Sequence, residues 1–226
     1  MHLRDLTQFL AELSENNHRA WFVMNKPRYD ILRVEFLDLV TALIPKVAKF
    51  DPAIAACNPK KALFRINRDL RFSHDKTPYK TTFSASLTPT GLKKPSQGGG
   101  PSYYFQINAA GVLLLAAGEW LPPADRLKVI RNRIVDDPEG FDKILKNKAL
   151  RQHFGGLQEE GKLKRPPKGF DPELPQIESL KFKNFIVWTE QHIEGMMPGV
   201  LEKELVTGFK TALPLVAWLR AIHTLS

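Results

Sequence analysis

Between residues 64 and 119 the sequence alternates short apolar-patterned segments with short polar connections, and this arrangement restricts the possible folds more than any other feature. The segments have the length and the period-two alternation of β-strands. They are Phe64–Phe72, Thr81–Thr88, Tyr103–Asn108 and Val112–Glu119. The connection Asn108-Ala-Ala-Gly111 has turn chemistry and predicts a hairpin between the last two segments. Because short connections join consecutive strands, we expect an antiparallel sheet.

Helical spacing of apolar residues flanks this region on both sides. Residues 3–15 predict one helix, and a second is expected to start with Pro27 in its first turn and to reach Val47. After the sheet region, helices are predicted over Ala124–Val135, over Phe141–Phe154, and from Leu201 to near Ile222 with an interruption at Pro214, and Leu180–Trp188 alternates as one late strand. The prediction is an α+β fold with a largely antiparallel sheet of about four to six strands.

The domain organisation follows from the same reading. We expect one α+β domain over residues 1–226, helical in 1–50, mostly sheet in 60–120, and with helices plus the late strand in 122–226. A single cysteine, Cys57, excludes an internal disulfide and fits a reducing compartment. The most apolar run, residues 112–118, is too short to cross a bilayer, and residues 1–13 are typical of an amphipathic helix rather than a signal peptide. A cytoplasmic protein with no membrane partner is the expectation.

The segment Lys60–Phe83 concentrates the positive charge of the chain. It holds seven Lys or Arg residues and two acids, a net charge of +5 out of +9 for all 226 residues. Arg68 stands where the alternation expects an apolar residue, so either a bulge at Arg68-Asp69 turns it outward or it is buried against a carboxylate. Arginine recognises phosphate and carboxylate groups through paired hydrogen bonds, so this segment is the candidate ligand site.

The candidate ligand-binding residues are the charged and aromatic side chains of this segment and a few residues elsewhere that would complete a basic, aromatic surface. They are Arg65, Arg68, Asp69, Arg71, Asp75, Lys76, Tyr79 and Lys80, with Trp21, Trp120 and Lys183. A second interpretation stays open: Asp69 and Asp75 would neutralise neighbouring cations, and the cluster would be an internal ion-pair network. Aromatic residues among cations stack nucleobases in some proteins and pack as core or rim in others.

Other kinds of chemistry find little support in the sequence. The six histidines are scattered without metal-ligand spacing, and neither a phosphate-binding loop nor a serine-hydrolase motif is present, so no metal and no cofactor are predicted. Glu119 ends a predicted strand and is the candidate general base if the protein is an enzyme.

Several segments together resemble one known family. They are Asn16–Phe22, Phe64–Lys80, Gly118–Pro122, Arg165–Asp171 and Leu180–Lys183. These segments are similar to a bacterial and fungal family of conserved hypothetical proteins, domain-of-unknown-function family 2461. The resemblance spans nearly the whole chain and implies a single full-length domain. It implies no particular activity.

Three functions are therefore compared. The first is a domain that binds, and in one version processes, a phosphate-bearing ligand such as a nucleotide, a nucleic acid or a phosphorylated metabolite. The second is a non-catalytic interaction domain in which the cluster is a structural network and the basic surface meets an acidic protein. The third is a metal-independent hydrolase, which requires acids beside the cluster that the arginines do not fully engage.

Overall fold

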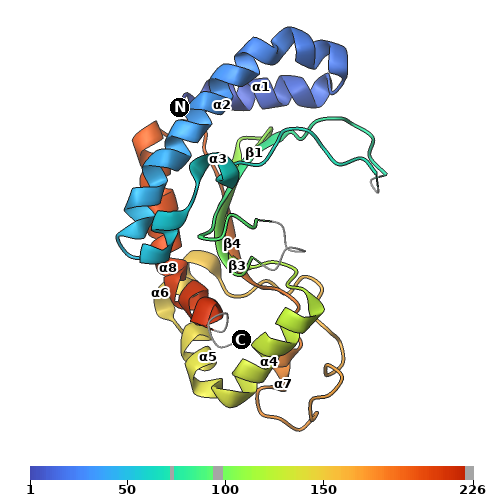
Figure 1. Cartoon of the computed structure of the whole chain (residues 1–226), viewed down its shortest axis with the longest axis vertical. Coiled ribbons are helices and arrows are strands. Elements are labelled where there is room, and N and C mark those ends of the chain that lie inside the picture. The colour runs from blue at the N-terminus through green and yellow to red at the C-terminus, as the bar shows by residue number, and fades with distance from the viewer. Residues whose placement is uncertain (72–73, 94–98, 222–226) are drawn as a thin grey trace. The chain divides into compact units, whose positions relative to one another are not determined.

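The computed structural model describes residues 1–71, 74–93 and 99–221 and confirms the α+β fold class (Figure 1). Its helices are α1 (Leu3–Glu15), α2 (Arg19–Ala48), the 3₁₀ helix η1 (Pro52–Ala56), α3 (Pro59–Ala62), α4 (Ala124–Asp136), α5 (Pro138–Leu145), α6 (Lys148–Phe154), α7 (Ile177–Leu180) and α8 (Pro198–Ala221). The strands are β1 (Thr82–Leu87), β2 (Ser102–Asn108), β3 (Val112–Glu119) and β4 (Phe185–His192). Among the described residues they form one antiparallel sheet in the order β1-β2-β3-β4.

The chain is organised as two compact units. The first unit comprises Met1–Gly91, Tyr104–Leu115 and Glu190–Thr207. The second comprises Leu92–Tyr103, Ala116–Thr189 and Gly208–Ser226. The organisation of residues 1–226 as a single domain stays a prediction. None of the helices among the described residues is long and apolar enough to cross a membrane.

The core of the first unit lies between α2 and the sheet. Phe36 on α2 places its ring 5.5 Å from that of Phe83 and 5.3 Å from that of Phe105. Tyr29, two turns earlier on the same helix face, lies 5.7 Å from Phe83. The apolar stripe of α2 is thereby removed from water, which is the main reason a helix of this length is stable.

Three helix predictions need correction. The helix expected over Phe141–Phe154 is divided into α5 and α6, because the side chain of Asn147 accepts a hydrogen bond from the Leu150 backbone and caps a new helix. The helix expected from Pro27 starts at Arg19, because the side chain of His18 accepts a hydrogen bond from the Trp21 backbone and Phe22 continues the buried stripe of Tyr29. Pro27 lies inside the helix on its exposed side. Pro214 likewise lies within α8 and does not interrupt it. Proline removes one helical hydrogen bond, and the packing of the other residues of the helix outweighs that loss.

The hairpin prediction is confirmed. The Asn108 side chain accepts hydrogen bonds from the backbones of Ala110 and Val112, at 2.9 and 3.0 Å, and its carbonyl accepts one from Gly111 at 3.1 Å. Gly111 has φ +68°, which only glycine adopts freely. These contacts fix the register between β2 and β3.

The late strand begins farther along the chain than predicted. Residues 177–180 form α7, and the strand is Phe185–His192 instead of Leu180–Trp188. The buried side chain of Asn184 is the physical reason, since it accepts a hydrogen bond from the Leu121 backbone and donates one to the Glu160 carbonyl. This crosslink holds the chain in a turn before the strand starts.

Candidate functional site

The basic segment is not the regular strand that its alternation predicts. Residues 64–71 and 74–80 run side by side as two extended segments that project from the sheet (Figure 1). Together we call these two segments the basic arm. Isolated antiparallel bridges join Leu63 to Ala85 and Asn67 to Tyr79. The backbone of Arg68 donates to the Pro78 carbonyl at 2.9 Å, and that of Lys80 donates to the Ile66 carbonyl at 2.8 Å. The arm therefore pairs with itself after leaving the edge of β1.

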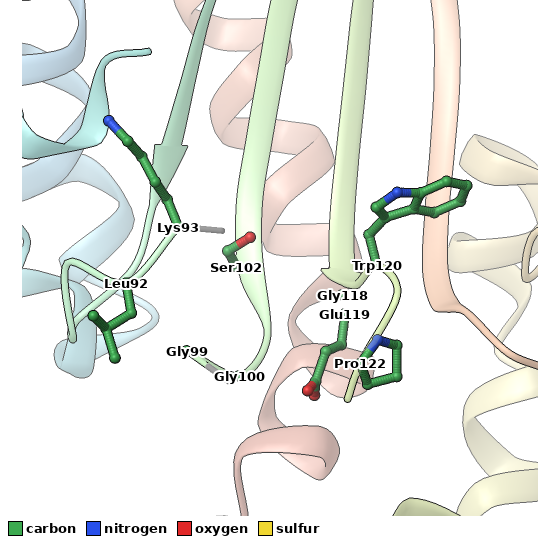
Figure 2. Close-up of a pocket in the computed structure, with 9 residues that line it drawn as sticks. All are labelled: Leu92, Lys93, Gly99, Gly100, Ser102, Gly118, Glu119, Trp120 and Pro122. Carbon is green, nitrogen blue, oxygen red and sulfur yellow. The ribbon is translucent and has the colours of Figure 1, made fainter. Parts of the chain in front are cut away.

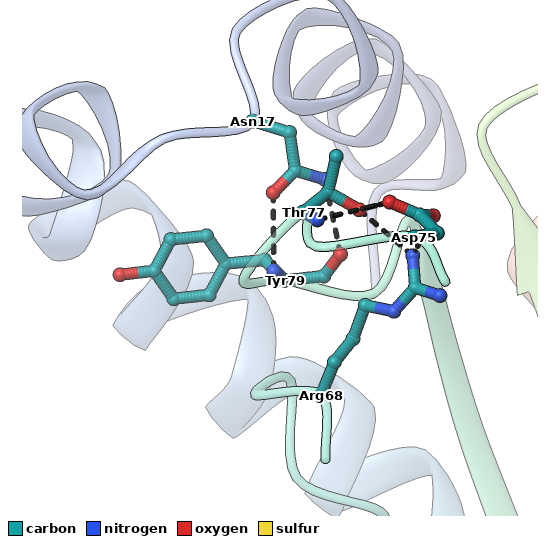
Figure 3. Close-up of polar contacts among 5 residues, drawn as sticks. All are labelled: Asn17, Arg68, Asp75, Thr77 and Tyr79. Atoms are coloured by element: carbon teal, nitrogen blue, oxygen red, sulfur yellow. Dashed lines mark hydrogen bonds and ion pairs between the residues drawn. The ribbon is translucent and has the colours of Figure 1, made fainter. Parts of the chain in front are cut away.

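The base of the arm is held by a side chain from the α1–α2 connection. The amide of Asn17 donates to the Tyr79 carbonyl and accepts from the Tyr79 backbone nitrogen, both at 3.0 Å (Figure 3). Asn17 thus takes the place that a neighbouring strand would occupy. The Tyr79 ring is buried and stacks on Phe22 of α2, with centroids 4.0 Å apart and planes 18° apart. Tyr79 is consequently an anchor of the arm.

Arg68 is held within the arm by Asp75 and Thr77. Its guanidinium forms an ion pair with the Asp75 carboxylate and donates to the Thr77 hydroxyl at 2.7 Å (Figure 3). The sequence left two alternatives for Arg68, a bulge that turns it outward or burial against a carboxylate. The structure has the carboxylate contact, but the Arg68 side chain is 28% exposed and therefore not fully buried. The arrangement crosslinks the two halves of the arm.

Asp75 also folds onto its own backbone. Its carboxylate accepts hydrogen bonds from the Thr77 backbone at 2.9 Å and from the Thr77 hydroxyl at 2.8 Å. These two bonds, and after them the bond from Arg68, favour the ionised carboxylate and lower the pKa of Asp75 to about 2. These bonds form an Asx turn, in which an Asp side chain accepts from the backbone two residues farther along the chain.

The second acid of the arm is paired as well. Both oxygens of Asp69 accept from the Arg71 guanidinium, at 2.9 and 2.7 Å, and the two side chains are 44% and 77% exposed. These side-chain bonds, and then the bond from the Arg71 backbone, lower the pKa of Asp69 below its usual range. Both carboxylates of the arm are thus engaged by arginine.

The remaining cations of the arm are presented differently. Lys76 is exposed, and its ammonium group donates to the Leu70 carbonyl at 3.0 Å. The ammonium of Lys80 lies 5.2 Å from the centre of the Phe64 ring. Arg65 is exposed and forms no ion pair with any residue that the structure describes. The arm therefore carries more cations than its two carboxylates neutralise.

Three of the candidate ligand residues lie outside the arm. Trp21 is a half-buried residue of α2, with its ring 5.7 Å from Phe9 of α1. Trp120 and Lys183 belong to the second unit. There Trp120 lies 5.7 Å from Trp188, and Lys183 is exposed in the turn before β4. The prediction that Trp21, Trp120 and Lys183 join the cluster is therefore not supported by contacts with the basic arm among the described residues.

Glu119, the candidate general base, is buried in an ion pair within the second unit. The Arg126 guanidinium of α4 donates to both carboxylate oxygens at 3.0–3.2 Å and to the Leu219 carbonyl at 2.7 Å. The two side chains are 6% and 8% exposed. A carboxylate held in this way is poorly placed to take a proton from a substrate. Arg126 was missed from the sequence, although it shares the apolar stripe of Ile130 and Ile134, where a charge signals a buried partner.

A small pocket in the second unit is lined in part by Glu119 (Figure 2). Its lining combines glycines with a few polar and apolar side chains, namely Leu92, Lys93, Gly99, Gly100, Ser102, Gly118, Glu119, Trp120 and Pro122. Because the Glu119 carboxylate is already engaged by Arg126, it has little hydrogen-bonding capacity left for a ligand in this pocket.

Other reactive groups do not gather into a site. Among residues 1–71, 74–93 and 99–221, no three His, Cys, Asp or Glu side chains are placed to hold a metal ion. Cys57 is buried, and this burial raises the pKa of its thiol, which disfavours the reactive thiolate.

The Asp75 contacts lead to a prediction for the acid side of the pH scale. Because the pKa of Asp75 in the folded protein, about 2, lies below its ordinary value of 3.8, its contacts stabilise the arm above that ordinary value and are lost as the pH falls through about 2. A carbon-detected NMR titration of the carboxyl group is expected to show a midpoint near 2. In Thr77→Val, which removes the hydroxyl bond, the midpoint should rise. A wild-type midpoint at 3.8 would show that the turn is not formed.

The comparisons with known proteins agree with the resemblance seen in the sequence. The search of curated proteins and the search of solved structures each found no significant match. One family model, described as "Conserved hypothetical protein (DUF2461)", matches residues 5–218. That span includes most of both compact units, the basic arm and the Glu119–Arg126 pair. The chain therefore belongs to the family of conserved hypothetical proteins DUF2461.

Proposed function

We propose that the basic arm binds a phosphate-bearing ligand and that the sugar-phosphate backbone of a nucleic acid is the class that suits it best. The observation that carries the proposal is the surplus of exposed cations on an arm whose two carboxylates are already paired. An acid that is engaged by an arginine competes less with an incoming phosphate for the other cations. The proposal therefore rests most directly on Arg65 and Lys76.

The shape of the arm favours an extended ligand over a small enclosed one. The cations stand on an exposed two-stranded projection, and the pocket at its base is mainly apolar, with Arg33 as the one cation among the described residues that line it. A polyanion can follow such a surface and contact several cations at once, which multiplies weak individual contacts. A free nucleotide offers fewer phosphates to the same surface.

The aromatic residues indicate backbone contacts rather than recognition of bases. The Tyr79 ring is stacked on Phe22, and the Lys80 ammonium covers Phe64. Because Tyr79 is buried and Lys80 occupies one face of the Phe64 ring, little ring surface is left for nucleobase stacking. We therefore expect binding that depends weakly on sequence and strongly on salt.

Within this proposal the members of the cluster have different roles. Arg68, Asp75 and Tyr79 position the arm, and Arg65 and Lys76, with Arg71 and Lys80, face the ligand. The alternative function, an interaction domain for an acidic protein, would use the same exposed cations. The two functions therefore differ in the ligand that binds, and only a comparison of ligands separates them.

The test is fluorescence anisotropy with a labelled single-stranded oligonucleotide of about 20 nucleotides, with inorganic phosphate, ATP and polyglutamate as competitors. We expect the double variant Arg65→Ala/Lys76→Ala to bind about tenfold more weakly, which corresponds to ~1.4 kcal/mol. Lys203→Ala removes an exposed cation from α8 and should bind like the wild type. Equal affinity in the double variant and the wild type would reject the proposal, and competition by polyglutamate alone would favour an acidic protein.

A further inference from the structure

Helix α2 carries a second apolar face that no described part of the chain covers. Val23, Met24, Ile31 and Val34 are 59%, 80%, 62% and 57% exposed, and they account for four of the exposed large apolar side chains of the described residues. All four lie within twelve residues of one helix. A lone exposed valine is ordinary, but a row of them on one helix face marks a contact surface.

This face lies opposite the buried one. At 100° per residue, Met24, Pro27, Ile31 and Val34 share one side of α2, and Phe22, Tyr29, Leu32 and Phe36 share the other. The exposed set repeats with spacings of three, four and three residues. That is the spacing of the contact positions in a two-helix coiled coil. We call Met24, Pro27, Ile31 and Val34 the α2 seam.

The spacing of the α2 seam reads the same in both directions along the helix. If two copies of α2 pack antiparallel around a two-fold axis near residue 29, Met24 of one copy meets Val34 of the other, and Pro27 meets Ile31. In the same register residue 19 lies opposite residue 39, which brings the exposed Arg19 to within one residue of the exposed Asp38 of the second copy along the helix axis. Arg19 and Asp38 form no ion pair with the described residues of their own chain, so both are available to the second copy.

We propose that the α2 seam is the interface of a symmetric, antiparallel homodimer. An isologous interface of this kind requires a surface complementary to itself, and both the palindromic apolar spacing and the opposite charges at its ends supply this. The distribution of charge along α2 also argues against a basic partner. The segment Arg19–Arg28 has a net positive charge, and the segment Asp30–Asp38 has more acids than bases.

The size of the interface sets its strength. Contact over residues 19–39 extends for about 30 Å along the helix, which corresponds to a buried area on the order of 1,000 Å² in total. This is the low end for specific interfaces, so we expect a reversible dimer with a dissociation constant on the order of tens of micromolar.

The first test is sedimentation equilibrium of the full chain between about 5 and about 500 µM, where mass action should convert monomer to dimer. Ile31→Glu places a charge in the centre of the seam and is expected to raise the dissociation constant at least about tenfold. Val200→Glu, an equivalent change at a 44% exposed valine of α8, should leave the dimer intact. Because Ile31 is 62% exposed, the variant should remain folded, and circular dichroism verifies this.

The second test concerns the orientation of the two helices. On mild oxidation, Met24→Cys/Val34→Cys should form disulfide-linked dimers, and Met24→Cys alone should not, because the two copies of residue 24 lie far apart in an antiparallel pair. Cys57 is present in every variant and is buried, so the crosslinking of the protein without added cysteines gives the background level. Crosslinking of the single variant would replace the antiparallel pair with a parallel one. A protein that stays monomeric at the highest concentration, or whose seam binds phosphatidylglycerol vesicles as a monomer, would overturn the proposal.

Discussion

Replacing Arg126 with methionine is expected to lower the free energy of unfolding by about 3–5 kcal/mol, because it leaves the Glu119 carboxylate buried without a partner. Glu119 is 5% exposed, so little water can reach its carboxylate in place of the guanidinium. The Leu219 carbonyl, which accepts a 2.7 Å hydrogen bond from Arg126, loses that bond as well. Urea unfolding followed by circular dichroism measures the change.

The double variant Glu119→Leu/Arg126→Met is the matched control. It removes both charges and keeps similar volume, and apolar replacements of buried ion pairs are often neutral in their effect on stability. We expect it to be clearly more stable than Arg126→Met alone. A single variant that loses less than about 1 kcal/mol would show that the carboxylate reaches water, and the pair would then be a surface contact.

Gly118→Ala is the second change with a large expected effect. A methyl group there would lie 2.1 Å from the Phe185 carbonyl oxygen and 2.8 Å from the Ile186 Cα. Both are backbone atoms of β4, so no side-chain rotation can relieve the overlap. Gly118 also has φ +125°, a conformation that residues with a Cβ rarely adopt. We expect a loss of about 2–6 kcal/mol in the free energy of unfolding, which combines backbone strain with overpacking.

Gly155→Ala separates these two causes. Gly155 follows α6 with φ +78°, and a Cβ there would meet no atom within 4 Å. It should therefore lose only the backbone term, about 1–2 kcal/mol. Thermal unfolding of both variants gives the comparison. Equal losses would mean that β3 and β4 lie farther apart at Gly118 than the structure has them.

The parts of the fold that the sequence predicted are those determined by local patterns. Helix α1 has its apolar residues at helical spacing, and the Asn108–Gly111 turn contains the side chain that organises it, so neither depends on distant residues. The sequence pattern places the start of α2 too late, because a proline is common in the first turn of a helix and so suggests a boundary at Pro27. Nothing in the local pattern shows that the packing of Phe22 continues the helix through Pro27.

The arm was misjudged for a different reason. Its alternation correctly indicated an extended backbone, but the residue that completes its hydrogen bonding, Asn17, is 62 positions away from Tyr79. The pairs of the cluster were predicted in part, since Asp69 and Asp75 were expected to meet neighbouring cations. That both ion pairs lie at the surface instead of in the interior depends on the tertiary structure, which the local pattern does not show. Because its partner Asp75 is about half exposed, Arg68→Ala should disturb the arm locally without the strong destabilisation expected for a buried pair.

The salt dependence of oligonucleotide binding tests the central claim most directly. Each phosphate contact contributes about 0.7 to the slope of log K against log salt for a single strand. If Arg65 and Lys76 contact phosphates, the slope of the Arg65→Ala/Lys76→Ala variant should be smaller than that of the wild type by about 1.4. Lys203→Ala should keep the wild-type slope. An unchanged slope in the double variant, or an equal fall in Lys203→Ala, would contradict the assignment of the basic arm as the binding site.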